Sequence, residues 1–217
     1  MKTRWALLLI LIGVPGCGWL KFGAGPGKTS TGGPPVMIDE SGWVPTGNDD
    51  LDTTSICLLD FMKQGRMTSL VDGRRSSVVV NKRTNGPSDF ISAEQIESET
   101  RRMNIPPGAI ASMQSRNTDL SEVTWIPPGL PFFVADLSTL PVDLKEMATS
   151  LPTVYPNVFA AVWLWLPGYS ADGNSALVRF TFAPTPSGAI ATYLLVKDET
   201  GKWRIMNRGL KYFAEPQ

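Results

Sequence analysis

The sequence predicts an α+β domain, in which helices from the first half of the chain cover an antiparallel sheet formed by the second half. Two patterns indicate this class. Apolar residues recur at helical spacing between residues 53 and 70, and four segments after residue 157 read as strands joined by short Gly-containing turns. Four consecutive strands with short turns form a four-stranded antiparallel meander, whose apolar face requires cover from the N-terminal helices.

The first predicted element is a helix over about residues 53–70, with Asp52 or Thr53 as its N-cap. Its broad apolar face contains Ile56, Leu58, Leu59, Phe61 and Met62. A short apolar strand follows at Ser77–Val80, after a turn that contains Gly.

Three weaker elements follow in the middle of the chain. Ser92–Gln95 has the spacing of a capping box and opens a surface helix that stops before Pro106. Leu130–Val134 is a candidate strand, and Pro141–Leu151 a candidate short helix.

The clearest strands lie at the C-terminal end. They span residues 158–166, 175–183, 189–197 and 202–208. Alternation places Phe180 and Phe182 on one face of the second of these strands, and Trp203 and Ile205 on one face of the last. We expect these two aromatic rows to meet beneath the first helix, and Arg208 to point outward.

This C-terminal segment resembles uncharacterised bacterial secreted and lipoprotein domains over roughly residues 157–213. The shared residues are Gly168-Tyr169-Ser170-Ala171-Asp172-Gly173, Ala176-Leu177-Val178, Gly188, Tyr193-Leu194-Leu195-Val196-Lys197 and Gly201-Lys202-Trp203-Arg204-Ile205. The resemblance implies a shared strand framework and no activity. A strand with Gly-Lys-Trp-x-Ile also occurs in nuclear-transport-factor-2-like (NTF2-like) domains, which implies an alternative fold, the NTF2-like cone.

The N-terminus has the pattern of an export signal. Lys2 and Arg4 precede an uncharged apolar run, Trp5–Val14, that is too short to span a bilayer comfortably. The run ends in Gly16-Cys17, which resembles a bacterial lipobox, although Pro15 departs from that pattern. Residues 1–17 are therefore interpreted as an export signal with Cys17 as the lipid attachment site; an uncleaved signal anchor and ordinary secretion are the alternatives.

Residues 18–50 are rich in Gly, Pro, Ser and Thr and read as a tether to the globular domain, residues 51–217. Within the tether, Gly23–Ser30 looks like a phosphate-binding loop. However, Phe22 occupies the position of its first Gly, and neither a core strand before it nor a helix after it is predicted. No nucleotide site is therefore predicted.

Composition excludes several classes of function. The chain has 20 basic and 20 acidic residues and no His. A balanced, scattered charge argues against nucleic acid as a partner. The absence of His rules out His-dependent nucleophiles and His-ligated metal sites, so no metal and no cofactor are predicted.

Carboxylates could still perform acid–base chemistry without His. The candidates are Asp136 with Asp143, and Glu94 with Glu97 and Glu99. Neither group lies in a catalytic motif, so solvated surface charge or a helix-terminus role is the favoured interpretation, and no catalytic residue is predicted.

A few other residues could suggest chemistry, but each has a simpler structural interpretation. Asp172 is a turn residue, Ser170 lacks a base within reach in the sequence, and Cys57 lies among apolar residues as a small buried hydrophobe. Trp163 and Trp165 alternate with Val162 and Leu164, so one set faces a core and the other needs cover from a helix, a ligand or a partner. Core packing is the favoured use of the two tryptophans.

Two hypotheses for function follow. The first is a non-catalytic, membrane-tethered binding or interaction module in a bacterial cell envelope, outside the cytoplasm, with an unidentified protein or small molecule as its ligand. The second is a small carboxylate-dependent hydrolase or isomerase with a cone-shaped pocket. The feature that separates them is a concave site with two or more convergent buried polar groups.

Overall fold

The computed structural model describes residues 45–67, 77–86, 98–99, 101–126, 132–183 and 189–212. The predicted export signal, Cys17 and the phosphate-loop-like segment lie outside the described residues. So do Glu94, Glu97 and the turn around Gly188.

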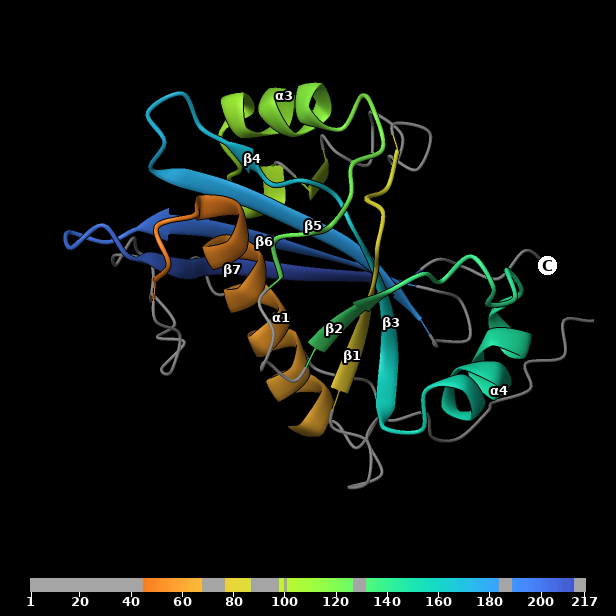
Figure 1. Ribbon diagram of the computed structural model, residues 1–217. Helices are drawn as coiled ribbons and strands as arrows, with labels where there is room; N and C mark the ends of the chain where they lie inside the picture. The colour runs from red at the N-terminus through yellow and green to blue at the C-terminus, as the bar shows by residue number, and fades with distance from the viewer. Residues whose placement is uncertain are drawn as a thin grey trace, which may run out of the picture.

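The described strands form one mixed sheet of seven strands, in the order β2-β1-β3-β5-β6-β7, with β4 paired to β5 (Figure 1). They are β1 (Ser77–Asn81), β2 (Phe132–Ala135), β3 (Val158–Leu164), β4 (Gly168–Tyr169), β5 (Ser175–Ala183), β6 (Ala189–Lys197) and β7 (Trp203–Tyr212). Helices and a mixed sheet make the class α+β. The sheet is larger than the predicted four-stranded one, because β1 and β2 extend it in parallel beyond β3.

Strand β3 pairs antiparallel with β5, β5 with β6, and β6 with β7. Between β3 and β5 the chain bends and then continues along β5 as β4, with Gly168 opposite Leu177. At the bend the buried side chain of Asn117 accepts a hydrogen bond from the Leu166 amide at 2.7 Å and donates one to the Leu166 carbonyl at 3.0 Å. The side-chain carboxamide of Asn117 thus replaces the backbone groups with which Leu166 would pair in a continuous strand.

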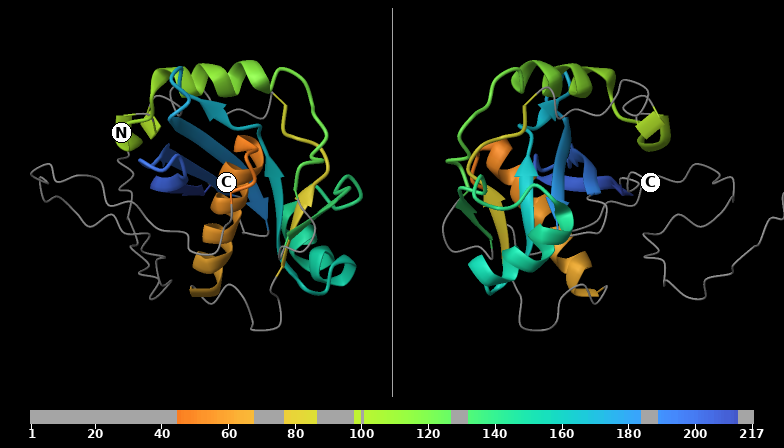
Figure 2. Two further views of the ribbon diagram at one scale, coloured as in Figure 1. Left: turned by 60° about the vertical axis from the view of Figure 1, so that its left-hand side comes forward. Right: turned by 90° about the vertical axis from the view of Figure 1, so that its right-hand side faces the viewer.

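Helix α1 (Asp49–Met67) lies along one face of the sheet, as Figure 2 shows. It begins earlier than predicted, because Asn48 is its N-cap: the Asn48 carboxamide oxygen accepts from the amides of Asp50 and Leu51 at 3.1 and 3.2 Å. The predicted cap Asp52 instead accepts from the amide and hydroxyl of Thr46, at 2.9 and 2.8 Å.

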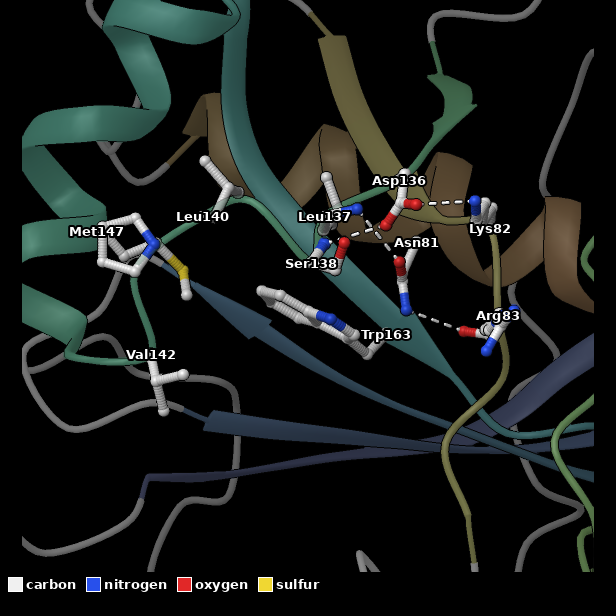
Figure 3. A pocket seen from close by; sticks show the side chains of 11 residues that line it. Asn81, Lys82, Arg83, Asp136, Leu137, Ser138, Leu140, Val142, Met147 and Trp163 are labelled. Atoms are coloured by element: carbon white, nitrogen blue, oxygen red, sulfur yellow. Dashed lines mark hydrogen bonds and ion pairs between the residues drawn. The ribbon is translucent and has the colours of Figure 1, made fainter.

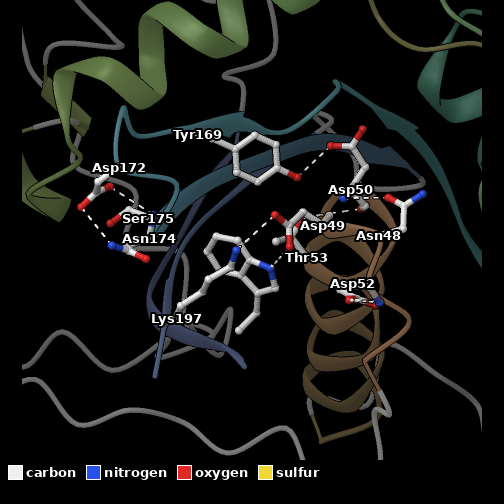
Figure 4. Close-up of polar contacts among 12 residues, drawn as sticks. Asn48, Asp49, Asp50, Asp52, Thr53, Tyr169, Asp172, Asn174, Ser175 and Lys197 are labelled. Atoms are coloured by element: carbon white, nitrogen blue, oxygen red, sulfur yellow. Dashed lines mark hydrogen bonds and ion pairs between the residues drawn. The ribbon is translucent and has the colours of Figure 1, made fainter. Parts of the chain in front are cut away.

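The first turn of α1 forms side-chain contacts with four other elements, and Figure 4 shows those of Tyr169 and Lys197. Asp50 accepts two hydrogen bonds from Arg116, at 2.8 and 2.6 Å, and one from the Tyr169 hydroxyl at 2.7 Å. Asp49 accepts from the Trp203 indole at 2.8 Å and forms an ion pair with Lys197 at 3.2 Å. Asp49 and Asp50, which the sequence places at the end of the tether, therefore contact the folded domain.

Beneath α1 lies the main hydrophobic core. Phe61 packs against Phe180 and Phe182, with ring centroids 5.4 and 4.6 Å apart. Trp203 and Ile205 belong to the same cluster, so the two aromatic rows meet beneath the first helix as expected. A core of this extent is the main stabilising feature of a domain of this size.

The opposite face of the sheet is covered in two separate places (Figures 1 and 2). Helix α4 (Leu144–Val154) places Leu151 against Val79 and Ala161. Helix α3 (Pro107–Arg116) lies at the other end of the sheet, where Met113 packs near Leu177. Helix α3 is not predicted from the sequence, because Pro106-Pro107 indicates the end of a helix. Pro107 in fact opens α3, a position that proline suits.

A bulge in β7 overturns the prediction that Arg208 points outward. The pairing with β6 shifts between Leu194 and Leu195, and an extra residue in one strand reverses the alternation beyond it. Arg208 therefore turns toward α1, where it donates to the carboxylate of Asp60 at 2.5 Å.

Candidate functional site

An open cavity of about 530 Å³ lies at the sheet edge where the parallel strands β1 and β2 end (Figure 3). Residues at the end of each strand or directly after it line the cavity: Asn81, Lys82 and Arg83 at β1, and Asp136, Leu137 and Ser138 at β2. Trp163 of β3 and Leu140, Pro141, Val142 and Met147 complete the lining. Because parallel strands bring their carboxyl ends to one edge, a cavity there gathers residues from distant parts of the sequence.

Asn81 holds the two strand ends together. Its side-chain oxygen accepts from the Leu137 amide at 3.2 Å, and its side-chain nitrogen donates to the Arg83 carbonyl at 3.0 Å. The Lys82 amide donates to the Ala135 carbonyl at 2.8 Å, which continues the pairing past the end of the strands. The polar side of the cavity is thus built on a fixed backbone.

The charged pair of the cavity is Lys82 with Asp136, whose side-chain atoms are 2.6 Å apart. The hydrogen bond from Lys82, together with those from Ser138, holds the pKa of Asp136 well below its ordinary value. Asp136 is therefore ionised at neutral pH and is a weak base. It can accept hydrogen bonds, but it is poorly suited to hold a proton for general-acid catalysis.

Trp163 divides the cavity into two sides. In Figure 3 its indole lies between the polar group around Asn81 and Asp136 and an apolar group that includes Leu140 and Val142. The indole is half-buried against the cluster beneath α4, whereas Val142 is 94% exposed at the rim. The neighbouring Trp165, by contrast, is completely buried.

The carboxylate pairs considered from the sequence do not form acid–base pairs among the described residues. Asp143 is the N-cap of α4 and accepts from the amides of Lys145 and Glu146, each at 2.9 Å. Glu99 is buried and forms an ion pair with Arg179 at 3.3 Å. The contacts of Asp143 agree with the helix-terminus interpretation, whereas Glu99 is buried and is not the solvated surface charge that the sequence favoured.

The other residues singled out in the sequence also have structural surroundings. Ser170 donates to Asp172 at 2.5 Å within the turn that precedes β5, and hydrogen bonds from Ser170 and then Asn174 lower the pKa of Asp172. Cys57 is completely buried in the core beneath α1.

Sequence reasoning missed a second polar cluster, between α1 and the sheet. Asp60, only 1% exposed, accepts from the Tyr193 hydroxyl at 3.1 Å and from Arg208 at 2.5 Å. Burial, with Asp60 nearby, raises the pKa of Tyr193 well above its ordinary value. An acidic residue within the apolar face of a predicted helix was the signal that could have revealed it.

The cavity beside this second cluster is about 20 Å³, lined in part by Phe61 and Tyr193. Such a volume holds a water molecule at most. A third cavity, of about 130 Å³, lies between the first turn of α1 and the start of β7, where Asp49 and Trp203 are already bonded to each other. Among the described residues, the buried polar groups of Asp60 and Tyr193 thus converge with Arg208 beside a space too small for a substrate.

Within the described ranges, no group of three or more His, Cys, Asp or Glu residues is arranged to hold a metal ion. No helix in the same ranges combines the length and apolar character needed to cross a membrane. Comparisons with protein-family models, with curated proteins and with solved structures find no match to this chain.

Proposed function

We propose that this chain is a membrane-tethered, extracytoplasmic binding module that works without catalysis, and that the cavity over Trp163 is its ligand site. The observation that carries the proposal is the form of this cavity: an open space of about 530 Å³, with an indole between a polar and an apolar side. Sites of roughly 300–1,000 Å³ with a few fixed polar groups are typical of ligand binding.

The polar groups of the cavity support binding rather than catalysis. Asp136 is neutralised by Lys82, and both side-chain polar atoms of Asn81 hold backbone groups. Such groups are preorganised to orient a ligand, but no pair of them forms a nucleophile with its base. The alternative of a carboxylate-dependent hydrolase or isomerase would require a substrate-sized space beside Asp60, where the cavity is about 20 Å³.

The sequence supports the proposed location of the domain, outside the cytoplasm and tethered to a membrane. Residues 1–17 have the pattern of an export signal that ends at Cys17, and residues rich in Gly and Pro connect it to the domain. The C-terminal residues that resemble bacterial secreted and lipoprotein domains lie mainly on β4 to β7. We take β3, β5, β6 and β7 to be the meander of that resemblance.

The tether is tested with the full-length chain expressed in a bacterial host, comparing wild type with Cys17→Ser. Acylation at Cys17 predicts that wild type fractionates with membranes and that the Ser variant does not. A Ser variant that stays membrane-bound and uncleaved would show a signal anchor instead. Wild type released into the soluble extracytoplasmic fraction would contradict the membrane tether.

The ligand site is tested by a fragment screen on the ¹⁵N-labelled domain. Small fragments concentrate at sites that bind ligands, so amide shifts should cluster on residues 81–83, 136–142 and 163. Trp163→Ala should remove these shifts, whereas Phe133→Ala, which removes an aromatic side chain on β2 that is 42% exposed, should leave them unchanged. Shifts that cluster at Asp60, Tyr193 and Arg208 would favour the enzyme hypothesis.

A further inference from the structure

Resting on the proposed function, we propose that the ligand of the cavity is a saccharide, with one sugar ring stacked on the indole of Trp163 and its hydroxyls bound by the polar side. The three features that lead to this ligand class are the aromatic floor, the mixture of donors and acceptors on the polar side, and the small amount of exposed apolar surface.

The aromatic floor suits a sugar ring. The face of an indole is electron-rich and attracts the weakly positive C–H groups on one face of a pyranose. Trp163 is half-buried, with one part packed in the cluster that contains Val79 and Leu151 and the rest lining the cavity. Its ring is therefore held in place before a ligand arrives, which reduces the entropy lost on binding.

The polar side offers both donors and acceptors, and its charged residues are the basic Lys82 and Arg83 and the acidic Asp136. Lys82 and Asp136 form an ion pair and remain 43% and 44% exposed, so each can bond to a ligand as well. Arg83 is exposed and adds one further positive charge to the described lining. Sugar hydroxyls both donate and accept, and therefore match such a mixed surface. Nucleic-acid binding needs a cluster of basic side chains, whereas here Lys82 is already paired with Asp136.

The apolar side is too limited for a lipid chain. Leu137, Leu140 and Met147 line it, but they are only 3%, 7% and 5% exposed, because the fold already buries them. The stabilisation from binding an alkyl chain scales with the apolar area that it covers, and little area is left here. Among the described lining residues, Val142 at the rim, Pro141 and the indole are the apolar surfaces that a ligand can reach.

The test is saturation-transfer difference NMR with glucose, galactose, N-acetylglucosamine and the β-linked disaccharides cellobiose, lactose and chitobiose. At least one of these is expected to receive saturation, strongest on the C–H protons of one ring face. Trp163→Leu should raise its Kd about tenfold or more, the loss expected for an aromatic stack. Trp163→Tyr keeps an aromatic face and should retain part of the affinity, and Phe133→Leu should match wild type.

Three results would overturn the saccharide. The first is that none of the six sugars receives saturation from the wild-type protein, although its cavity still binds fragments. The proposed function then stands, and the ligand class is wrong. The second is sugar binding that Trp163→Leu leaves unchanged, because the sugar then binds elsewhere. Octyl sulfate is included as an amphiphile: preferential binding of it at residues 81–83 and 163 over every sugar would favour a lipid ligand and also contradict the proposal.

Discussion

The two faces of the sheet differ in how they are covered. On one face a single helix, α1, packs along the strands, and the aromatic residues beneath it are buried, with Phe180 completely so. On the other face α3 and α4 cover opposite ends and belong to separate clusters. Beyond the part of the sheet that α4 covers, Trp163 remains half-buried and lines the open cavity.

The comparison teaches which aromatic residues stabilise the fold and which are available to a ligand. Trp203 beneath α1 is 5% exposed and donates its indole N–H to Asp49 at 2.8 Å. Trp163 lines an open cavity at the end of the parallel strands. We infer that the face beneath α1 provides stability, and that the edge near β1 and β2 provides function.

The largest effect is expected from truncating the core on the face beneath α1. Trp203→Ala should lower the free energy of unfolding by ~3–5 kcal/mol, because it removes a large buried side chain and the partner of Asp49. Chemical denaturation measures the change. A variant with unchanged stability would show that Trp203 belongs to a ligand pocket and would remove the distinction between the two faces.

The next effect concerns the buried ion pair on the same face. Asp60→Ala leaves the hydroxyl of Tyr193 and the guanidinium of Arg208 without their acceptor, and should cost ~2–4 kcal/mol. The double variant Asp60→Leu with Arg208→Met removes both charges, and should recover part of this loss. If the double variant is less stable than the single one, burial of an unpaired charge is not the cause.

A smaller effect is expected at the helix beside the cavity. Asp143→Ala removes the two N-cap bonds of α4 and should cost ~1 kcal/mol, while Asp143→Asn, which can still cap, should cost less. Neither variant should change fragment binding, because Asp143 does not line the cavity. A large loss of binding in Asp143→Asn would mean that the carboxylate has a role in the site beyond capping.

Local patterns were sufficient to predict part of the fold. The alternation around Phe180 and the turn glycines Gly173 and Gly201 located the antiparallel strands closely. Both glycines adopt positive φ, 68° and 77°, which other residues rarely accept. The bulge in β7 was not predictable, because one extra residue leaves no mark in the composition of the strand, and it reversed the expected direction of Arg208.

The candidate site could be predicted only in fragments. Asp136 was noted as a carboxylate and Trp163 as an aromatic residue that needs cover, but nothing in the sequence shows that β1 and β2 pair in parallel. That pairing brings Asn81 beside Leu137, which is 56 residues later. The site therefore depends on a long-range contact, which local patterns do not encode.

The most direct test of the two-face account measures stability and binding in one variant, Trp163→Ala. The account predicts a loss of unfolding free energy less than half that of Trp203→Ala, together with loss of fragment shifts at residues 81–83 and 136–142. A loss of stability equal to that of Trp203→Ala, with fragment binding retained, would contradict the account: it would make Trp163 a core residue and the cavity incidental.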